Sequence, residues 1–308
     1  MARSAVAVVG AGGFLGRAVV SCLAARGVPA VTFTRQSPVL DRRGDLAPQL
    51  ADCYAVSWLA TVITPHLAAT QPERVTNEVA TFQAFLSEVE KLPEPPRVVL
   101  ASSGGTIYDP STPPPYREQS PTRPHSEYGR AKLRLEDMLR ASTVPGIILR
   151  VANAYGPGQP VAAGQAVLAH WMHAICQGRP ITVFGSLDTA RDYVYIDDIA
   201  QAFVAAATHP GPLPEVVNVA SGEPTRLGTL LDILTELACE DIEVRHEPAR
   251  SFDVARTWLA VELARDAFGW QPTTGLPDGI ATAWADARGR ANGRSPHAAG
   301  VKIEGSTS

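Results

Sequence analysis

The chain has 308 residues, of which 45% are hydrophobic and 19% are charged, and its formal net charge is −4. A chain of this size can bury a substantial core in one large domain or in two unequal ones. The slight acidic excess and the lack of a basic stripe argue against nucleic-acid binding. The sequence has no apolar stretch of membrane-spanning length and no signal-like segment, so we expect a soluble, cytoplasmic protein that does not bind membranes.

The first part of the chain has the pattern of a strand, a tight glycine turn and a helix. Residues 5–9 form an apolar run, and Gly10, Gly13 and Gly16 follow at three-residue steps. The pattern predicts a helix over 14–26 that ends at a glycine. Glycine tolerates positive φ and lets backbone N–H groups approach a pyrophosphate at the positive end of a helix. We therefore predict a dinucleotide-binding turn, with a plain strand-to-helix turn as the alternative.

Further along, apolar runs typical of strands alternate with helical patterns. The expected strands cover 31–34, 53–59, 97–102 and 147–151, and the expected helices cover 72–89 and 127–141. This alternation predicts an α/β fold with a doubly wound parallel sheet, a Rossmann fold. Ligands bind such a sheet at the carboxyl ends of its strands.

The division of the chain follows from where this alternation weakens. We predict a dinucleotide-binding domain over residues 1–155, on which a segment near 192–219 packs, and a smaller C-terminal substrate lobe over 156–290. Residues 291–308 have little to bury and are expected to form a mobile tail. The proline-rich residues 109–124 are expected to form an irregular surface loop near the site.

Cysteines and histidines could in principle hold a metal or form disulfides. The four cysteines have no disulfide, redox or metal-ligand spacing, and they are Cys22, Cys53, Cys176 and Cys239. His170 and His173 lie three residues apart on an expected helix, without further ligands nearby in the sequence. We therefore predict buried, reduced thiols and no metal site.

The strongest chemical signal is the pentapeptide YGRAK, from Tyr128 to Lys132. A spacing of four residues places both side chains on one helix face. A lysine ammonium about 5 Å from the phenol would lower its pKa from about 10 by about two units. Tyr128 would then exchange a proton near neutral pH, although a Tyr/Lys pair on a helix can also be an ordinary surface contact.

Several motifs occur in a fixed order along the chain: VVGAGGFLG, SSGGTIY, YGRAK, LRVANAYGPGQ, VFGSLDTARDYVYIDDIA, NVASGEPT and ARSFDV. With these motifs, nearly the whole chain resembles the extended short-chain dehydrogenase/reductases that act on nucleotide-diphosphate sugars. The resemblance implies a nicotinamide-binding sheet and a C-terminal lobe that holds the nucleotide sugar. It also implies a homodimer formed through a helix bundle.

The resemblance implies roles for individual residues as well. Tyr128 would be the acid/base, and Lys132 would hold the nicotinamide ribose. Cofactor contacts are implied for Gly10, Gly13, Phe14, Leu15, Gly16, Asp45, Leu46, Leu59, Ala60, Tyr128 and Lys132, with Asp45 at the adenine. Contacts to the nucleotide diphosphate are implied for Asn153, Arg191, Arg250 and Asp253.

Physical chemistry supports the substrate arginines, because a diphosphate needs local bidentate donors in a slightly acidic protein. For Arg191 and Arg250, salt bridges to Asp192 and Asp253 are the alternative. Asp197 and Asp198 follow a strand-like run, and we expect them to cap the next helix and to have a structural role.

One stretch departs from the pattern of the family. Many relatives carry Ser or Thr four positions before the residue that here is Tyr108, and this chain has Gly104. We expect Thr106 to take over the proton-relay role, with Ser103 as the second candidate. The stretch also lacks the Thr-Asp-Glu run of the sugar 4,6-dehydratases. Without those carboxyl groups, water elimination has no acid and no base, which argues against a dehydratase.

Arg35 bears on the choice of cofactor. About 20 residues after the glycine turn, NAD-specific enzymes place an acid that binds the ribose hydroxyls. Here the second strand is followed by Arg35, and the first acid after it is Asp41. An arginine, helped by Thr34 or Ser37, would attract a 2′-phosphate, whereas the alternative is a solvated arginine after a strand. We therefore favour NADP(H) over NAD(H).

Together these features predict an oxidoreductase. Since reductases of this kind use NADPH and the epimerases keep NAD, Arg35 favours reduction of a nucleotide-diphosphate keto sugar. By resemblance, the substrate is a dTDP-4-keto-6-deoxyhexose. An NAD-dependent C4 epimerase is the alternative, because it uses the same Tyr and Lys. A non-catalytic NADP-sensing protein is disfavoured, because such relatives commonly lose Tyr128 or Lys132.

Overall fold

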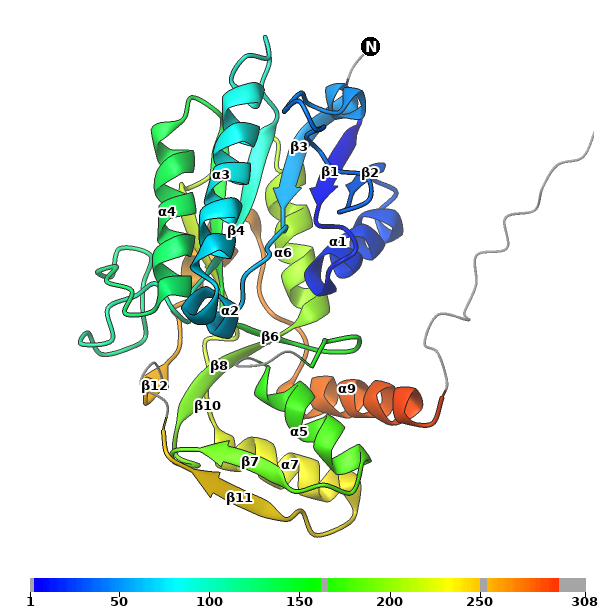
Figure 1. The fold of residues 1–308 in the computed structure, drawn as a ribbon, viewed down its shortest axis with the longest axis vertical. Helices are drawn as coiled ribbons and strands as arrows, with labels where there is room; N and C mark the ends of the chain where they lie inside the picture. Colours follow the sequence, from blue (N-terminus) through cyan, green and yellow to red (C-terminus); the bar gives the residue numbers. More distant parts are fainter. Residues whose placement is uncertain (1–2, 162–165, 250–253, 294–308) are drawn as a thin grey trace, which may run out of the picture.

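A six-stranded parallel sheet forms the larger part of the molecule (Figure 1). The computed structural model describes residues 3–161, 166–249 and 254–293. The strands lie in the order β2-β1-β3-β4-β5-β9, and every neighbouring pair is parallel. Their bounds are Ala5–Val9 (β1), Ala30–Phe33 (β2), Cys53–Trp58 (β3), Arg97–Ser103 (β4), Gly146–Val151 (β5) and Val216–Val219 (β9). The predicted doubly wound α/β fold is confirmed.

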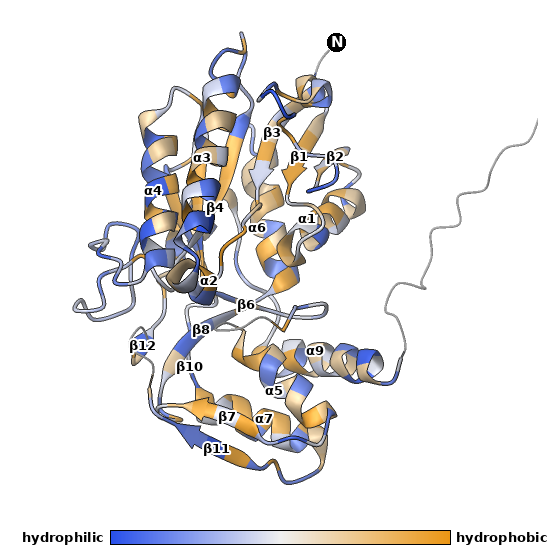
Figure 2. Cartoon of the chain, in the orientation of Figure 1, coloured by the Kyte–Doolittle hydropathy of each residue, from blue (hydrophilic) through white to orange (hydrophobic). Residues whose placement is uncertain are grey.

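Helices cover both faces of this sheet. One face carries α1 (Phe14–Ala25), α6 (Ile196–Thr208) and α8 (Glu262–Phe268), and the other carries α3 (Pro72–Val89) and α4 (Glu127–Ala141), with α2 (Pro65–Thr70) beside them. Because successive side chains of a strand point to opposite faces, Val6 and Val8 pack toward α1 and α6, whereas Ala7 and Val9 pack toward α3 and α4. Figure 2 shows the resulting pattern of apolar strands between helices with polar outer surfaces.

A smaller part of the molecule lies beyond the carboxyl ends of the large sheet (Figure 1). One of its sheets contains β6 (Asn153–Tyr155), β8 (Ala190–Tyr195), β10 (Pro224–Arg226) and β12 (Arg256–Thr257), and the other pairs β7 (Ile181–Phe184) with β11 (Val244–Glu247). Its helices are α5 (Val167–Cys176), α7 (Leu227–Ala238) and α9 (Leu276–Ala291). Trp171, Leu230 and Trp284 are buried in the core that these elements share.

The chain passes from the large sheet to the smaller part and back again. After β8, α6 packs against α1, and β9 then pairs in parallel with β5. The predicted division into domains at residue 155 stays a prediction. Most of the predicted tail, residues 294–308, lies outside the described residues.

Most element boundaries fall within one residue of those expected from the sequence. The helices expected over 72–89 and 127–141 have those bounds, whereas the first helix ends at Ala25 and not at Arg26. Arg26 is its C-cap, and Gly27 follows with φ +67°. The four cysteines are free thiols, as predicted, but the prediction that they are buried holds for Cys53 alone, because Cys22 and Cys176 are partly exposed and Cys239 is exposed.

The capping prediction for Asp197 and Asp198 is wrong. Both lie in the first turn of α6, whose N-cap is Tyr195 without a side-chain hydrogen bond. The strand β8 runs directly into the helix, so neither aspartate occupies the capping position. Asp198 instead accepts hydrogen bonds from Thr273 (N 3.1 Å, Oγ1 2.8 Å) and from Thr274 N (3.0 Å), which fixes the segment before α9. Asp198 therefore has a structural role, but it acts through Thr273 and Thr274 and not by capping α6.

Candidate active site

A cavity of about 2110 Å³ lies between the large sheet and the smaller part of the molecule. The carboxyl ends of β1 to β5, the start of α1 and the first turns of α4 line one side of it. The strands β2 and β3 lie on opposite sides of β1, so the direction in which the chain adds strands to the sheet reverses at β1. Sheets of this kind bind ligands at such a reversal.

The glycine turn closes one wall of the cavity. Gly10 has φ +95°, and a Cβ on Gly16 would lie 2.1 Å from the carbonyl oxygen of Gly10. The turn therefore depends on the absence of side chains. The N-cap of α1, Gly13, makes no side-chain capping bond, and the first turn of the helix contains no acidic residue. Its backbone N–H groups can therefore receive an anion such as a pyrophosphate.

Tyr128 and Lys132 lie one turn apart on α4, and both line the cavity. Ser126 caps this helix by accepting a hydrogen bond from Gly129 N (3.1 Å). The Lys132 ammonium lies 5.6 Å from the centre of the Tyr128 ring, so the predicted proximity is present.

Thr106 and Ser103 reach the same cavity from the end of β4 and the loop after it. Thr106 Oγ1 donates a hydrogen bond to Ser103 Oγ (2.9 Å). A Cβ on Gly129 would lie 2.4 Å from the Thr106 carbonyl oxygen, so α4 packs directly against this loop. At Gly104 a Cβ would lie 2.4 Å from Leu259 Cδ1, so the position of the usual hydroxyl residue is crowded in this chain.

The predicted lowering of the Tyr128 pKa is wrong. Burial raises the pKa of this phenol, Lys132 opposes the change, and the nearby Glu78 carboxylate raises the pKa again. The sequence argument included the lysine charge but neither the cost of burying a phenolate nor the second charge. Glu78, on α3, accepts a hydrogen bond from Lys132 Nζ at 2.8 Å.

Glu78 was not identified from the sequence, although the sequence holds a signal for it. The apolar stripe of α3 includes Val75, Val79 and Phe82, and Glu78 falls within this stripe. A charged residue on the buried face of an amphipathic helix requires a partner.

On the substrate side, Asn153 and Arg191 line the cavity. Asn153 Nδ2 donates to the carbonyl of Asp192 (2.8 Å), and Arg191 donates to the carbonyl of Ala190 (3.0 Å). Other basic side chains line this part of the cavity and were not identified as a group from the sequence: His170, His173, Arg179 and Arg245. Arg250 and Asp253 lie outside the described residues.

The Asp192 carboxylate is occupied by backbone and hydroxyl donors. It accepts hydrogen bonds from Ser221 N and Oγ (both 2.7 Å), from Gly222 N (3.0 Å) and from Leu259 N (3.3 Å). Arg191 is not among these hydrogen-bond donors.

Comparison with known proteins gives the same picture. The model of the NAD dependent epimerase/dehydratase family matches residues 6–220. The chain belongs to this family. A dTDP-4-dehydro-6-deoxyglucose reductase of Escherichia coli is 27% identical over 90% of this chain and 96% of its own. A UDP-glucose 4-epimerase of Mycolicibacterium smegmatis is 33% identical over 68% of this chain and 67% of its own. The structure of a Thermus thermophilus UDP-glucose 4-epimerase in complex with NAD has a TM-score of 0.81 and 25% identity, and the match covers 92% of this chain and 99% of that one.

Of the other family positions assigned to the cofactor, Phe14, Leu15, Leu59 and Ala60 line the cavity, as does Arg35. Asp45 and Leu46 are not among the lining residues. Asp45 belongs to a turn in which its N–H donates to Asp41 Oδ1 (3.0 Å) and its carbonyl accepts from Asp41 N (2.9 Å). Leu46 is bridged to Leu40, which does line the cavity. The adenine contact of Asp45 stays a prediction.

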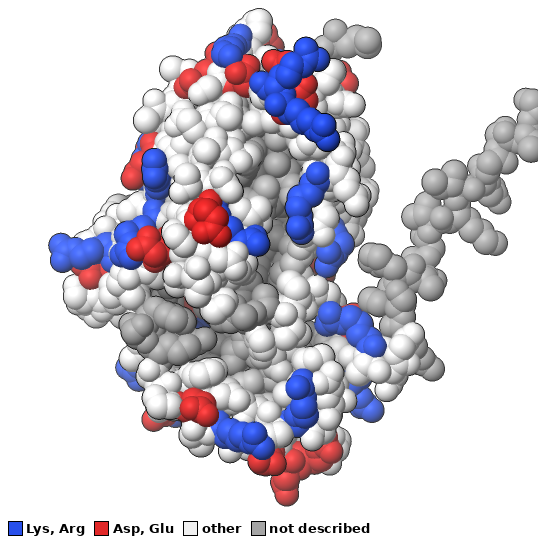
Figure 3. Space-filling view, in the orientation of Figure 1, with Lys and Arg blue, Asp and Glu red and all other residues white. Residues whose placement is uncertain are grey.

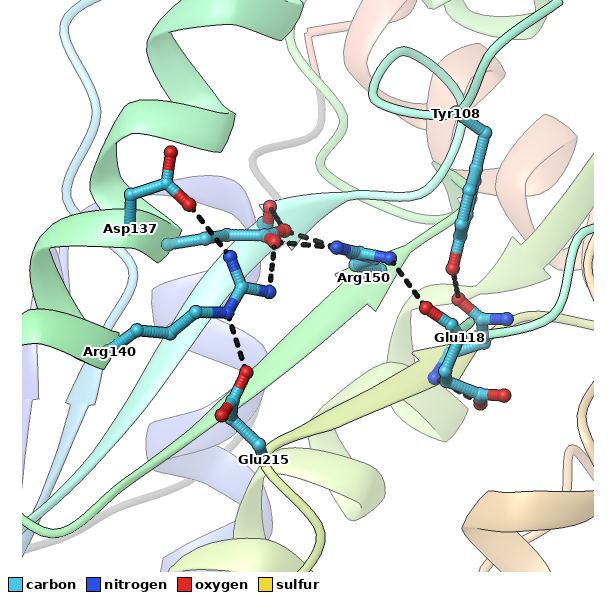
Figure 4. Close-up of polar contacts among 9 residues, drawn as sticks. Tyr108, Glu118, Asp137, Arg140, Arg150 and Glu215 are labelled. Carbon is cyan, nitrogen blue, oxygen red and sulfur yellow. Dashed lines mark hydrogen bonds and ion pairs between the residues drawn. The ribbon is translucent and has the colours of Figure 1, made fainter. Parts of the chain in front are cut away.

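A buried polar network behind the cavity holds the proline-rich loop (Figure 4). Arg150, on β5, donates to both carboxylate oxygens of Glu136 (3.0 and 2.7 Å) and to the carbonyl of Glu118 in the loop (3.2 Å). Tyr108 donates to Asn218 Oδ1 at 2.6 Å. Since Glu136 also accepts from the residue before Ser103, the network links the loop to the site.

On the face in Figure 3, basic and acidic side chains lie in separate small groups among mostly uncharged residues. Among the described residues, none of the helices is long and apolar enough to cross a membrane. The same residues contain no cluster of three or more potential metal ligands.

Proposed function

We propose that the protein is an NADPH-dependent reductase of a nucleotide-diphosphate keto sugar, with a dTDP-4-keto-6-deoxyhexose as its substrate. The observation that carries this proposal is the position of Arg35, which lines the cavity just beyond the carboxyl end of β2. A guanidinium there attracts the 2′-phosphate of NADPH, whereas an acid would bind the ribose hydroxyls of NADH.

The chemistry assigned to the chain is proton delivery. When bound, the reduced nicotinamide supplies the hydride. Tyr128 donates its proton to the carbonyl oxygen of the sugar, Lys132 holds the ribose, and the Thr106 hydroxyl, bonded to Ser103, relays the proton or binds the sugar oxygen. Because burial raises the pKa of Tyr128, the phenol is protonated at neutral pH, as a proton donor must be.

The nucleotide diphosphate is assigned to the basic side of the cavity. Asn153 and Arg191, with Arg179 and Arg245 nearby along the lining, supply amide and guanidinium donors for two phosphate charges. This assignment places the sugar between the smaller part of the molecule and Tyr128. We also propose that the protein is a cytoplasmic homodimer.

A C4 epimerase is the second candidate, and the M. smegmatis epimerase, at 33% identity, supports it. The E. coli reductase, which aligns over 96% of its own length, supports the first. Both reactions use Tyr128 and Lys132, so the two candidates differ in the cofactor, and Arg35 in the cavity lining favours the reductase.

The test uses both candidate reactions. A dTDP-4-keto-6-deoxyhexose is offered with NADPH or NADH while the absorbance of reduced nicotinamide is followed, and UDP-glucose is offered without reductant. We expect NADPH to be consumed with a preference over NADH of about 10- to 150-fold. Formation of UDP-galactose without net cofactor change would contradict the proposal.

The role of Arg35 is tested separately. Arg35→Asp should reverse the cofactor preference toward NADH, because it replaces attraction of the 2′-phosphate by repulsion. The matched control is Arg42→Asp, since Arg42 is exposed nearby but does not line the cavity. An equal loss of NADPH preference in both variants would show that the preference depends on the overall charge of this surface and not on a contact between Arg35 and the 2′-phosphate.

A further inference from the structure

A carboxylate lies inside the buried face of α3, directly behind the site. Glu78 is 6% exposed and shares its helix face with Val75, Val79 and Phe82. A carboxylate in such a place is strongly unfavourable unless it is paired and hydrogen-bonded.

Both oxygens of this carboxylate accept hydrogen bonds, and the donors come from α4 and from the segment after β3. Glu78 Oε1 accepts from Lys132 Nζ (2.8 Å), and Oε2 accepts from the N–H of Val62 (2.8 Å). The Thr61 hydroxyl lies 2.9 and 2.8 Å from the two oxygens. Glu78 therefore joins α3 to the first turns of α4 and to the segment after β3.

Two of these partners face the cavity, whereas Glu78 does not. Lys132 and Thr61 are among the lining residues, and Glu78 is absent from them. An ammonium has three N–H donors, and Lys132 directs one at Glu78 and a longer one at Thr61 Oγ1 (3.4 Å). One donor remains for a ligand in the cavity, and Glu78 determines how the ammonium is turned.

We propose that Glu78 is a positioning residue that fixes the Lys132 ammonium and the Thr61 hydroxyl toward the cofactor and balances the lysine charge beside Tyr128. The proposal rests on the proposed function, in which Lys132 holds the nicotinamide ribose and Tyr128 donates the proton. It adds a residue behind the site that favours the protonated form of Tyr128.

The charges that act on the Tyr128 phenol, among the described residues, are those of Lys132 and Glu78. Burial raises the pKa of Tyr128, the lysine lowers it and the glutamate raises it. Burial lowers the pKa of Lys132, but the charge of Glu78, the charge of Tyr128 and the hydrogen bond to Glu78 together raise it above its ordinary value, so the ammonium stays protonated. The pair is thus nearly neutral, and the phenol keeps its proton.

Other titratable groups lie on the segments that pack around this pair. They are Arg74 on α3, which donates to Gln71 and Val62, exposed His66 on α2, His125 before α4, Glu127 paired with Arg130, and Arg150 on β5 paired with Glu136. The charges that act on the Tyr128 phenol in the described part of the chain are those of Lys132 and Glu78, so the pH effect described next is assigned to Glu78.

The proposal predicts the direction in which the pH dependence of the rate shifts when Glu78 is replaced. A reductase needs protonated Tyr128, so its rate falls as the pH rises through the pKa of the phenol. Glu78 moves this alkaline limb to higher pH, and its removal must move the limb to lower pH. In Glu78→Gln we expect the rate at alkaline pH to fall about tenfold relative to the rate at neutral pH.

The experiment compares Glu78→Gln with Glu73→Gln, which removes the same charge from an exposed position on the same helix. Three quantities are measured: kcat/KM of NADPH-dependent reduction against pH, NADPH affinity by fluorescence, and tyrosinate formation by ultraviolet absorbance with Tyr128→Phe as the blank. Glu78→Gln should move the tyrosinate transition and the alkaline limb to lower pH and weaken NADPH binding about tenfold. Glu73→Gln should change none of them.

Wild-type transitions and wild-type NADPH affinity in Glu78→Gln would overturn the proposal. If that variant does not fold, Glu78→Asp keeps the charge and shortens the side chain. It should preserve the alkaline limb while weakening NADPH binding, and unchanged NADPH binding would exclude a positioning role. If the keto sugar is not reduced, the proposed function fails, while the tyrosinate transition and the NADPH affinity still decide the role of Glu78.

Discussion

Helix α4 carries two buried ion pairs one turn apart, and they differ in what they face. Lys132 pairs with Glu78 of α3 and lines the cavity, whereas Glu136 pairs with Arg150 of β5 and lies behind it. Glu136 is fully enclosed, and its oxygens are shared among Arg150, Arg140 and a serine hydroxyl. Only the first pair has a member in the cavity lining, so we propose a functional role for the first pair and a structural role for the second.

The largest effect on turnover is expected at Tyr128, beside the ion pair of Lys132 and Glu78. Tyr128→Phe keeps the ring but removes the proton, so kcat should fall by about 10² to 10⁴ while nucleotide-sugar binding stays within a few-fold. The control is Tyr108→Phe, which removes a hydrogen bond to Asn218 near the other pair and should leave turnover largely intact. Activity of Tyr128→Phe within threefold of the unmodified enzyme would show that the acid has been misassigned.

The second pair should respond in stability. Glu136→Gln leaves the Arg150 guanidinium buried without a counter-charge, so the free energy of unfolding should fall by about 3–5 kcal/mol. Denaturant unfolding measures the loss, and the fraction that remains folded should retain its NADPH affinity. A loss of NADPH affinity in folded Glu136→Gln would erase the distinction between the two pairs.

On the substrate side, Arg191→Ala should weaken binding of the nucleotide sugar and of the free nucleoside diphosphate by about 1.5–3 kcal/mol, because a charge-assisted contact to phosphate is lost. Calorimetry measures both. Arg226→Ala, on the neighbouring strand β10 and paired with exposed Asp188, serves as the control and should bind normally. Equal affinities in the two variants would remove Arg191 from the substrate site.

The smallest effect should separate two hydroxyls. Thr106 donates to Ser103, so Thr106→Val should lower kcat about tenfold with a smaller change in KM, and Ser103→Ala should do less. Steady-state kinetics at saturating NADPH give both values. The opposite ranking would make Ser103 the residue next to the reacting oxygen.

The sequence was sufficient to predict those features of the fold and the site that depend on residues close together in the chain. The glycine turn, the strands and the Tyr128 to Lys132 spacing are local, and they predicted the sheet and the wall of the cavity. The pKa of Tyr128 was not predictable in this way, because it depends on burial and on Glu78, which lies 50 residues earlier in the chain. The same holds for Asp198, whose partners at Thr273 and Thr274 lie far along the chain.

The central claim, reduction with NADPH, is tested most directly by following the hydride itself. The enzyme is given a dTDP-4-keto-6-deoxyhexose and NADPH that carries deuterium at the transferable position, and the sugar product is analysed by mass spectrometry. The account predicts one deuterium on the former carbonyl carbon of each product molecule, with equal loss of NADPH. A product that contains no deuterium, or an epimerised sugar with the NADPH unchanged, would contradict it.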